Sequence, residues 1–236
     1  MLIIGIDTSG KTASCALCED ERVLAQCSLA TARAHSQVIL PMVKRLLTDS
    51  GRDISEVDGY AVVTGPGSYT GIRIGIGAVK GLCMGGGKVC AGVSALEAVA
   101  RNFAGSESTA CACMHARQEL YYGAFFRTYT DGSVDRLSPD MLIPLAELAD
   151  KAVRLAADVP VICVGDGSAA LTEAAGCGNV KAAPVYLNSP SPVGVVMSGI
   201  AAGFHSPEEL TAEYMSVTKA EKELEGKGIS TDNCTQ

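Results

Sequence analysis

Residues 65–75 are Gly65-Pro66-Gly67-Ser68-Tyr69-Thr70-Gly71-Ile72-Arg73-Ile74-Gly75, and they directly follow a β-forming run at residues 59–64. This order predicts a strand, a glycine-rich turn and a helix that continues to about residue 84, where Gly85-Gly86-Gly87 ends it. We expect Ser68 or Thr70 to cap the helix. The alternative is an anion bound by the turn at the helix N-terminus.

The predicted helix is rich in glycine. Four glycines lie inside it, and each interior glycine costs roughly 0.5–1 kcal/mol relative to alanine. Such a helix persists only where close backbone packing offsets that loss. Helical spacing places the small residues on two faces: Gly71, Gly75 and Ala78 on one, and Gly77, Gly81 and Gly85 on the other. We expect one face to pack on the chain's own sheet. The other packs on a helix of the same chain or, as we favour, of another protein.

Strands and a helix are also predicted before this unit. An apolar run at residues 2–7 and β-forming runs at 12–18 and 22–29 predict an antiparallel meander. A helix follows at residues 36–50, and its apolar stripe is wider than one buried face requires. Either the chain buries this helix on two sides, or one side packs on a partner. Pro41 should kink the helix or mark its first turn.

A second unit with the same order of elements follows. A strand at 88–92 and a helix at 94–103 complete the first unit. The second unit starts near Ser108 and has strands at 109–114 and 119–128, a helix at 144–157, a strand at 159–164 and a helix to about 175. A helix at 191–203 comes after it. We therefore predict an α/β protein with two related subdomains that have mixed sheets, residues 1–104 and 105–189. A helix within residues 190–222 should return to pack on the first subdomain, and residues 226–236 should form a disordered tail.

The composition indicates a globular, acidic chain. Apolar residues make up 47% and charged residues 19%, and 19 basic against 26 acidic side chains give a net charge of −7. The basic residues are not clustered, which disfavours strong direct binding of a nucleic acid. No apolar run is long enough to cross a membrane, and the N-terminal residues lack the basic segment of a signal peptide. We therefore expect a cytoplasmic protein whose ten cysteines are free thiols.

Residues 5–12 match the P-loop pattern G-x-x-x-x-G-K-[ST] literally. A P-loop requires a helix that begins near Lys11, whereas this sequence predicts a second strand there, so we prefer a β-hairpin. In such a hairpin Asp7, Thr8 and Ser9 are similar to the phosphate-binding turn of actin-like ATPases. These three residues are therefore candidates for a vestigial nucleotide-binding site, with weak ATP or ADP binding at most and no required cofactor.

Segments along nearly the whole chain carry a family resemblance. They are Ile6-Asp7-Thr8-Ser9, His35-Ser36 with Leu40-Pro41, residues 65–75, Ala116-Arg117-x-Glu119-Leu120-Tyr121, and Tyr214 with Ala220-Glu221. On these residues the chain resembles the TsaB family, a paralogue of TsaD, and the glycine motif is the most specific of them. The chain departs from the family at His115, where an acidic residue is usual.

The resemblance implies the actin-like, sugar-kinase-like (ASKHA) fold. It also implies a tRNA-modifying system in which TsaD holds the active site and TsaE is an ATPase. That system transfers threonylcarbamoyl from threonylcarbamoyl-AMP to the tRNA adenosine next to the anticodon. The chain would be a non-catalytic scaffold that pairs with TsaD and forms a homodimer when TsaD is absent. TsaD binds metal through two histidines spaced i,i+4. The first corresponds to His35, but the second position is Ile39, so no metal site is expected.

The expected partner interface lies on the helices at 36–50 and 70–84. Its residues are His35, Ser36, Ile39, Leu40, Val43, Leu47, Thr70, Gly71, Arg73, Ile74, Gly75 and Ala78. On this hypothesis, Gly75→Leu abolishes pairing with TsaD without unfolding the chain. The main rival hypothesis is a small stand-alone ATP-dependent enzyme that uses Asp7 and Thr8 for magnesium-nucleotide. A P-loop NTPase that depends on Lys11 is a third.

Overall fold

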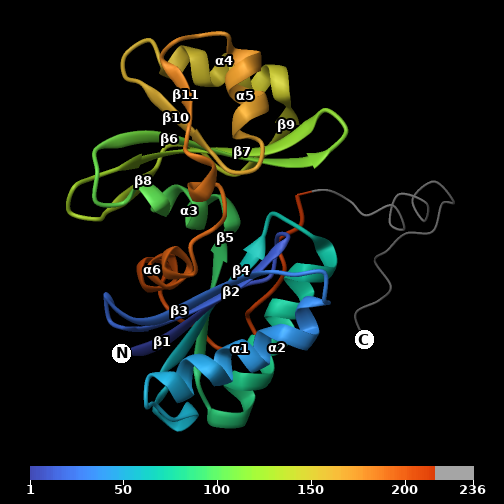
Figure 1. The fold of residues 1–236 in the computed structure, drawn as a ribbon, viewed down its shortest axis with the longest axis vertical. Coiled ribbons are helices and arrows are strands. Elements are labelled where there is room, and N and C mark those ends of the chain that lie inside the picture. Colours follow the sequence, from blue (N-terminus) through green and yellow to red (C-terminus); the bar gives the residue numbers. More distant parts are fainter. Residues whose placement is uncertain (216–236) are drawn as a thin grey trace, which may run out of the picture.

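The computed structural model describes residues 1–215. Figure 1 shows two β-sheets, one in each half of an elongated molecule, with helices packed on them. The first sheet has the strand order β3-β2-β1-β4-β5, and the second has the order β11-β10-β6-β7-β8, with β9 paired to β7. The strands are β1 (Leu2–Asp7), β2 (Thr12–Glu19), β3 (Arg22–Ala30), β4 (Gly59–Gly65), β5 (Val89–Ser94), β6 (Ser108–Arg117), β7 (Leu120–Thr128), β8 (Val134–Arg136), β9 (Met141–Pro144), β10 (Val161–Val164) and β11 (Val180–Ala182).

Six α-helices accompany the sheets in the described residues. They are α1 (His35–Asp49), α2 (Tyr69–Gly86), α3 (Ala95–Ala100), α4 (Leu145–Leu155), α5 (Ser168–Ala175) and α6 (Pro192–Ala202). Short 3₁₀ turns lie at Ile54–Glu56, Arg101–Phe103 and Val185–Leu187. Helix α1 begins at His35, so Pro41 lies beyond its first turn, and the helix continues through Pro41 to Asp49.

Strand β1 lies at the centre of the first sheet. It pairs antiparallel with β2 and parallel with β4, and all six of its residues are buried. Helices α1 and α2 cover one face of this sheet, and α6 covers the other (Figure 1). A strand that is covered on both faces needs apolar side chains on both, which explains the uninterrupted apolar run before Asp7.

The second sheet repeats the topology of the first. In each sheet three strands form an antiparallel meander, and two further strands then continue the sheet in parallel beside the first strand of the meander. The predicted α/β fold with mixed sheets is therefore confirmed. The sequence did not indicate β8, β9 and β11, which have three or four residues and show no periodic pattern. The equally short β10 was recognised because it is a continuous apolar run that ends at a glycine.

Helices α3 and α6 connect the two halves of the chain. Buried Leu96 and Val99 of α3 pack with Phe126 of the second sheet, while α6 returns to the first sheet. The returning helix was predicted at 191–203, within the segment 190–222, and α6 spans Pro192–Ala202, before Gly203 with φ +85°. Residues 203–215 contain no helix, and the part of the prediction beyond residue 215, including the tail 226–236, lies outside the described residues.

The cysteines of the described chain are free thiols, and most are buried within strands. Burial raises the pKa of Cys15 to about 12 and that of Cys18 to about 11. Thiols with such pKa values remain protonated at neutral pH and pack as small apolar groups. Among residues 1–215, no group of three or more His, Cys, Asp or Glu side chains is arranged to hold a metal ion. In the same range, no helix has the length and hydropathy needed to cross a membrane.

Candidate functional site

Helix α2 begins at the glycine-rich turn and is capped as the sequence predicts. The Ser68 side chain accepts a hydrogen bond from the Gly71 amide at 3.3 Å, which confirms the capping role. Gly65 and Gly67 have φ values of +151° and +157°. A Cβ on Gly65 would lie 2.3 Å from the Glu213 carbonyl oxygen, and a Cβ on Gly67 would lie 2.7 Å from the Ser9 carbonyl oxygen. The turn is therefore enclosed by two other segments of the same chain.

Gly71 and Gly75, which we call the packed glycine face, press α2 onto its own sheet. A Cβ on Gly71 would lie 2.1 Å from the Thr8 carbonyl oxygen, and one on Gly75 would lie 2.6 Å from Thr8 Oγ1 and 3.1 Å from Val62 Cγ2. Both glycines are buried. The assignment of Gly71 and Gly75 to a partner interface is therefore wrong, and we now expect Gly75→Leu to destabilise the chain.

Gly77, Gly81 and Gly85, which we call the open glycine face, lie on another side of α2. No atom lies within 4 Å of a Cβ built at any of these three positions. All three are exposed, and Met84 beside them is 77% exposed. The segment around Ile54 and Ser55 borders Gly81 and Gly85 across a hollow, but no other segment of the described chain packs directly on the three glycines.

The two sides of helix α1 differ in burial more than the wide apolar stripe in its sequence suggested. The inner side belongs to the core of the first subdomain and consists of Val38, Ile39, Met42, Val43, Leu46 and Leu47. Ile39, Val43 and Leu47 are at most 5% exposed. These three were predicted to contact a partner, and the prediction is wrong because the sheet and α2 already cover them.

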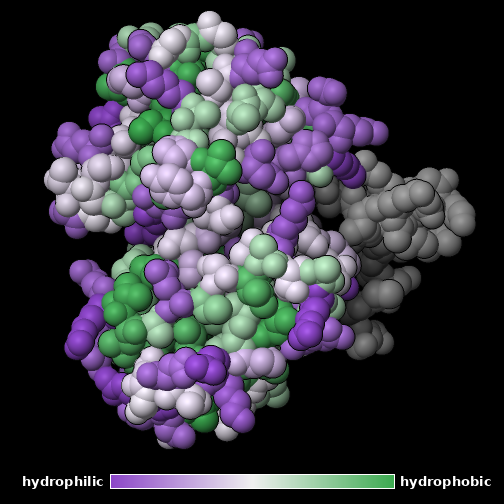
Figure 2. Space-filling model, in the orientation of Figure 1, coloured by the Kyte–Doolittle hydropathy of each residue, from purple (hydrophilic) through white to green (hydrophobic). Residues whose placement is uncertain are grey.

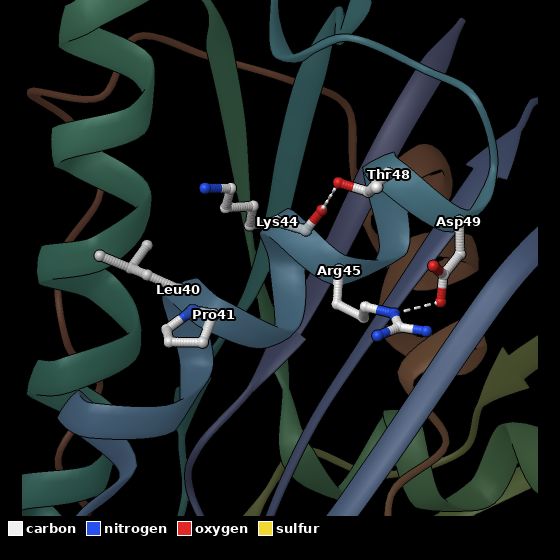
Figure 3. Close-up of a pocket in the computed structure, with 6 residues that line it drawn as sticks. All are labelled: Leu40, Pro41, Lys44, Arg45, Thr48 and Asp49. Atoms are coloured by element: carbon white, nitrogen blue, oxygen red, sulfur yellow. Dashed lines mark hydrogen bonds and ion pairs between the residues drawn. The ribbon is translucent and has the colours of Figure 1, made fainter.

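The outer side of α1 borders a shallow hollow of about 660 Å³. Its lining residues are Leu40, Pro41, Lys44, Arg45, Thr48 and Asp49. Figure 3 shows Leu40 and Lys44 pointing toward the side of α2, whereas Arg45 and Asp49 pair at 2.5 Å away from it. Leu40 is 46% exposed, whereas the other large hydrophobic side chains of α1 are buried. In Figure 2 exposed apolar and polar surface alternate over this lower half of the molecule.

The other predicted interface residues remain accessible to different degrees. Ser36, Leu40, Thr70 and Arg73 are exposed, while His35, Ile74 and Ala78 are half-buried. Together with the open glycine face they form a continuous surface, because α1 and α2 contact each other. The outer surface of the two helices is therefore the candidate binding surface, although fewer of the predicted residues contribute to it than expected.

An aromatic cluster lies at the N-terminal end of α2. The rings of Tyr69 and Tyr214 stack with centroids 4.7 Å apart. The Arg73 guanidinium lies 4.0 Å from the Tyr69 ring centroid and donates from Nε to the Tyr214 hydroxyl at 2.8 Å. The Glu213 amide donates to the Thr64 carbonyl at 2.9 Å, which holds the C-terminal segment against this end of the helix. Tyr214 is one of the residues that carry the family resemblance, but nothing in the sequence linked it to Tyr69.

Asp7, Thr8 and Ser9 form the turn after β1 and are at most 2% exposed. The Asp7 carboxylate accepts from the Ser9 amide at 2.8 Å, and burial raises the pKa of Asp7. The Thr8 hydroxyl donates to the Gly71 carbonyl at 2.7 Å, and the Ser68 amide donates to the Ser9 carbonyl at 2.8 Å. The turn thus binds the start of α2, whereas the buried Ser9 hydroxyl has no hydrogen-bond partner among the described residues.

His35, the first residue of α1, joins this arrangement. Its Nδ1 lies 3.1 Å from the Thr8 carbonyl oxygen, so it connects α1 to the same turn. The P-loop hypothesis is wrong, because Lys11 lies in a tight turn between the antiparallel strands β1 and β2 and no helix begins until residue 35. Phosphate binding in a P-loop depends on the amides of a helix that starts at the loop.

The turn after β10 corresponds, in the second subdomain, to the glycine-rich turn after β4. Asp166 accepts a hydrogen bond from the His115 amide at 2.9 Å, and His115 Nε2 lies 3.1 Å from the Gln118 carbonyl oxygen. Gly165 has φ +109°, and a Cβ there would lie 2.2 Å from the Cys113 carbonyl oxygen. The glycines around Asp166 therefore serve a tight turn. His115 folds back onto its own hairpin.

The repeated strand order of the two sheets defines an actin-like, sugar-kinase-like fold. YeaZ from Pseudomonas aeruginosa has the same fold, with a TM-score of 0.76 and 24% identity over 91% of this chain and 99% of that chain. The TsaB proteins of Escherichia coli and Bacillus subtilis, named as tRNA threonylcarbamoyladenosine biosynthesis proteins, are 44% identical over 101 residues and 31% identical over 147 residues. Those matches cover 43% and 62% of this chain, and 43% and 64% of the two relatives.

A sequence model of one protein family matches residues 28–229, and its description is TsaD, tRNA N6-adenosine threonylcarbamoyltransferase. The chain therefore belongs to this family, and within it to the proteins named TsaB. The matches to the two TsaB proteins span less than two thirds of their lengths.

Proposed function

We propose that the chain takes part in tRNA threonylcarbamoyladenosine biosynthesis as the non-catalytic partner of a TsaD-type threonylcarbamoyltransferase. The partner binds the outer surface of α1 and α2, and TsaE is a further member of the assembly. The proposal rests on the names of the related proteins for the process. For the binding surface, the proposal rests on the geometry of α1 and α2. A role in tRNA modification also implies a cytoplasmic location.

The open glycine face is the observation that carries the binding surface. Gly77 and Gly81 each weaken an exposed helix by roughly 0.5–1 kcal/mol relative to alanine, and nothing in the described chain packs against them. On the packed glycine face a close neighbour offsets the same penalty, since larger side chains would collide with Thr8. A helix of another protein that approaches α2 closely supplies the missing compensation on the open side.

The residues around the open glycine face have the composition of a binding surface. Leu40 and Met84 supply exposed apolar area, and Tyr69, Arg73 and Tyr214 form a cluster of the residue types that dominate interface energetics. Stacking between these three side chains fixes their positions before a partner arrives, which lowers the entropy lost on binding. A smooth glycine surface beside ordered aromatic side chains suits a closely packed helix–helix contact.

The same surface supports a homodimer when no TsaD-type partner is present. A two-fold contact uses one surface twice, so the homodimer and the heterodimer compete for α1 and α2. We therefore expect the partner to convert a dimer of this chain into a heterodimer, with both species sensitive to the same substitutions.

The test is a substitution on the open glycine face. Gly81→Leu has free space in the isolated chain, so the chain should fold normally, whereas pairing with the TsaD protein of the same organism should weaken by about 100-fold or more. Gly178→Leu is the matched control, because it also adds a side chain into open space but lies far from α1 and α2 in the fold. Affinity measured by calorimetry and melting curves of both variants separate binding from folding. Wild-type affinity of Gly81→Leu would overturn the proposed surface.

Calorimetry with magnesium-ATP distinguishes the scaffold from a stand-alone enzyme. The scaffold hypothesis predicts no turnover by the chain alone, since Asp7 and Thr8 are buried and hydrogen-bonded within the fold. Micromolar binding of ATP together with turnover that is lost in Asp7→Ala would replace the scaffold with the enzyme.

A further inference from the structure

The second sheet carries a hollow that lies away from the candidate binding surface. It has a volume of about 550 Å³ and lies between α4 and the segment at residues 137–141. Buried Phe125 of β7 lies at its base, with Met141 and Leu155 beside it. This size is typical of small-molecule sites. None of its lining residues belongs to α1 or α2.

The hollow exists because the strand beside β7 is interrupted. β8 pairs with β7 at residues 126–128 and β9 pairs with it at residues 120–123, so the connecting chain leaves the sheet opposite Phe125. The backbone of Phe125 nevertheless stays satisfied. Its amide donates to Ser138 Oγ at 3.0 Å, and its carbonyl accepts from the Leu137 amide at 2.8 Å. The gap is therefore an ordered feature of the fold, because both the amide and the carbonyl of Phe125 have hydrogen-bond partners.

The outer wall of the hollow is held in place by polar contacts to α3. Asp140 accepts from the Ser94 hydroxyl at 2.6 Å and pairs with Arg136. Arg136 in turn pairs with Glu97 at 3.1 Å, and Glu97 pairs with Arg101 at 3.2 Å. These contacts fix both ends of the segment that bulges away from β7. A wall that is already ordered loses little entropy when a ligand binds.

The lining of the hollow is apolar at the base and charged at the rim. Leu137, which is 47% exposed, extends the apolar surface of Phe125 upward along one wall. On the opposite wall Lys151 and Arg154 of α4 lie at the rim, and Asp158 follows the helix. Lys151 also pairs with Glu147 at 3.6 Å, one turn back along α4. The three rim residues together carry a net charge of +1.

We propose that this hollow binds a small amphipathic carboxylate. The hydrocarbon part of the ligand packs on Phe125, Met141 and Leu155, and the carboxylate lies beside Lys151 and Arg154. Asp158 and the carbonyl groups at the C-terminal end of α4 repel an anion at the far end of the rim. They therefore direct the carboxylate toward Lys151, one turn earlier in the helix.

Calorimetry on the full chain with sodium decanoate tests the proposal. We expect saturable binding at one site, and binding of decanol and of decyltrimethylammonium that is about ten-fold weaker or more, since neither complements the two cationic side chains. Absence of saturable decanoate binding would overturn the site. Equal binding of all three compounds would overturn the assignment of a carboxylate, because it would leave only the apolar contact.

Two leucine variants locate the binding. Leu137→Glu places a charge in the wall of the hollow and should weaken decanoate binding by about ten-fold or more. Leu29→Glu is the matched control, because Leu29 is 40% exposed on β3 of the other sheet, and we expect no change in affinity. Both positions are exposed enough to accept glutamate in the folded chain. Equal affinities of the two variants would show that decanoate binds elsewhere and would overturn the proposal. Because the hollow is separate from α1 and α2, this outcome is independent of the proposed function.

Discussion

The two glycine faces of α2 consist of the same residue type in the same helix, yet their surroundings are opposite. Gly71 and Gly75 lie against Thr8 so closely that a single added carbon collides with it, whereas Gly77, Gly81 and Gly85 have open space around them. Each glycine weakens the helix by about the same amount. The comparison shows that helical glycines indicate close approach of a neighbour, but that their spacing does not say whether the neighbour belongs to the same chain.

Gly75→Leu tests the packed glycine face and should have the largest effect on stability. Its side chain meets Thr8 Oγ1 and Val62 Cγ2, so we expect the free energy of unfolding to fall by about 3 kcal/mol or more. Chemical denaturation measures this loss, and Gly178→Leu, which enters open space, should remain close to wild type. A Gly75→Leu variant as stable as the control would mean that the two faces of α2 do not differ.

Asp7→Asn probes the turn on which the packed glycine face rests. Burial raises the pKa of Asp7 above its ordinary value of 3.8, so the folded chain binds the proton more tightly than the unfolded chain. The free energy of unfolding contributed by Asp7 therefore falls as pH rises from about 3.8 through the folded pKa. Asparagine cannot ionise, and its side-chain oxygen can still accept from the Ser9 amide. We expect Asp7→Asn to be more stable than wild type at pH 7, by on the order of 1 kcal/mol.

Denaturation curves at several pH values check this prediction. The advantage of Asp7→Asn should shrink as pH is lowered through the folded pKa and should be lost below 3.8, where the wild-type carboxyl becomes protonated in both states. A constant difference across that range would indicate that ionisation of Asp7 does not affect stability.

Ser68→Ala tests how α2 is held at the end where its packed face begins. Loss of the bond from the Gly71 amide should lower the free energy of unfolding by about 1 kcal/mol. Thr70 was the other candidate cap in the sequence, but it is exposed and Ser68 occupies the capping position. Thr70→Ala should therefore have little effect in thermal melts, and equal losses in the two variants would contradict the assignment of the cap.

Gly77→Ala tests the open glycine face and should have the smallest effect, with the opposite sign. With no atom near the new methyl group, the isolated chain should gain roughly 0.5–1 kcal/mol in free energy of unfolding. Gly71→Ala is the matched comparison, since its methyl group would lie 2.1 Å from the Thr8 carbonyl oxygen and should destabilise the chain. Opposite signs in these two variants would sharpen the difference between the faces, and equal signs would remove it.

Local patterns predicted most of the elements correctly. The strand at 59–64, the turn and the capped helix after it were recognised because glycine, proline and serine restrict the backbone locally. For the same reason, the residues around Lys11 correctly predicted a β-hairpin in place of a P-loop. The strands at 134–136 and 141–144 were missed, because so few residues show no periodicity and their pairing with β7 is a long-range event.

The candidate site was predicted less well than the fold. The outer helices were located, and Leu40 and Arg73 lie on the exposed surface as expected. Ile39, Val43 and Leu47 were assigned to the wrong side, because a wide apolar stripe does not show how much of it the chain's own sheet covers. Tyr69 and Tyr214 are 145 residues apart in sequence, and only the path of the C-terminal segment brings their rings together.

The sequence by itself determined where backbone conformation is constrained, which strands run consecutively as a meander, and that α2 is smooth on two sides. These features depend on residues a few positions apart, so they can be recognised without a fold. Only the tertiary structure decided which glycines are already covered and which apolar residues of α1 are buried. It also decided where the edge of the second sheet opens into a hollow. Each of these depends on segments far apart in the sequence, whose approach is set by the packing of the whole chain.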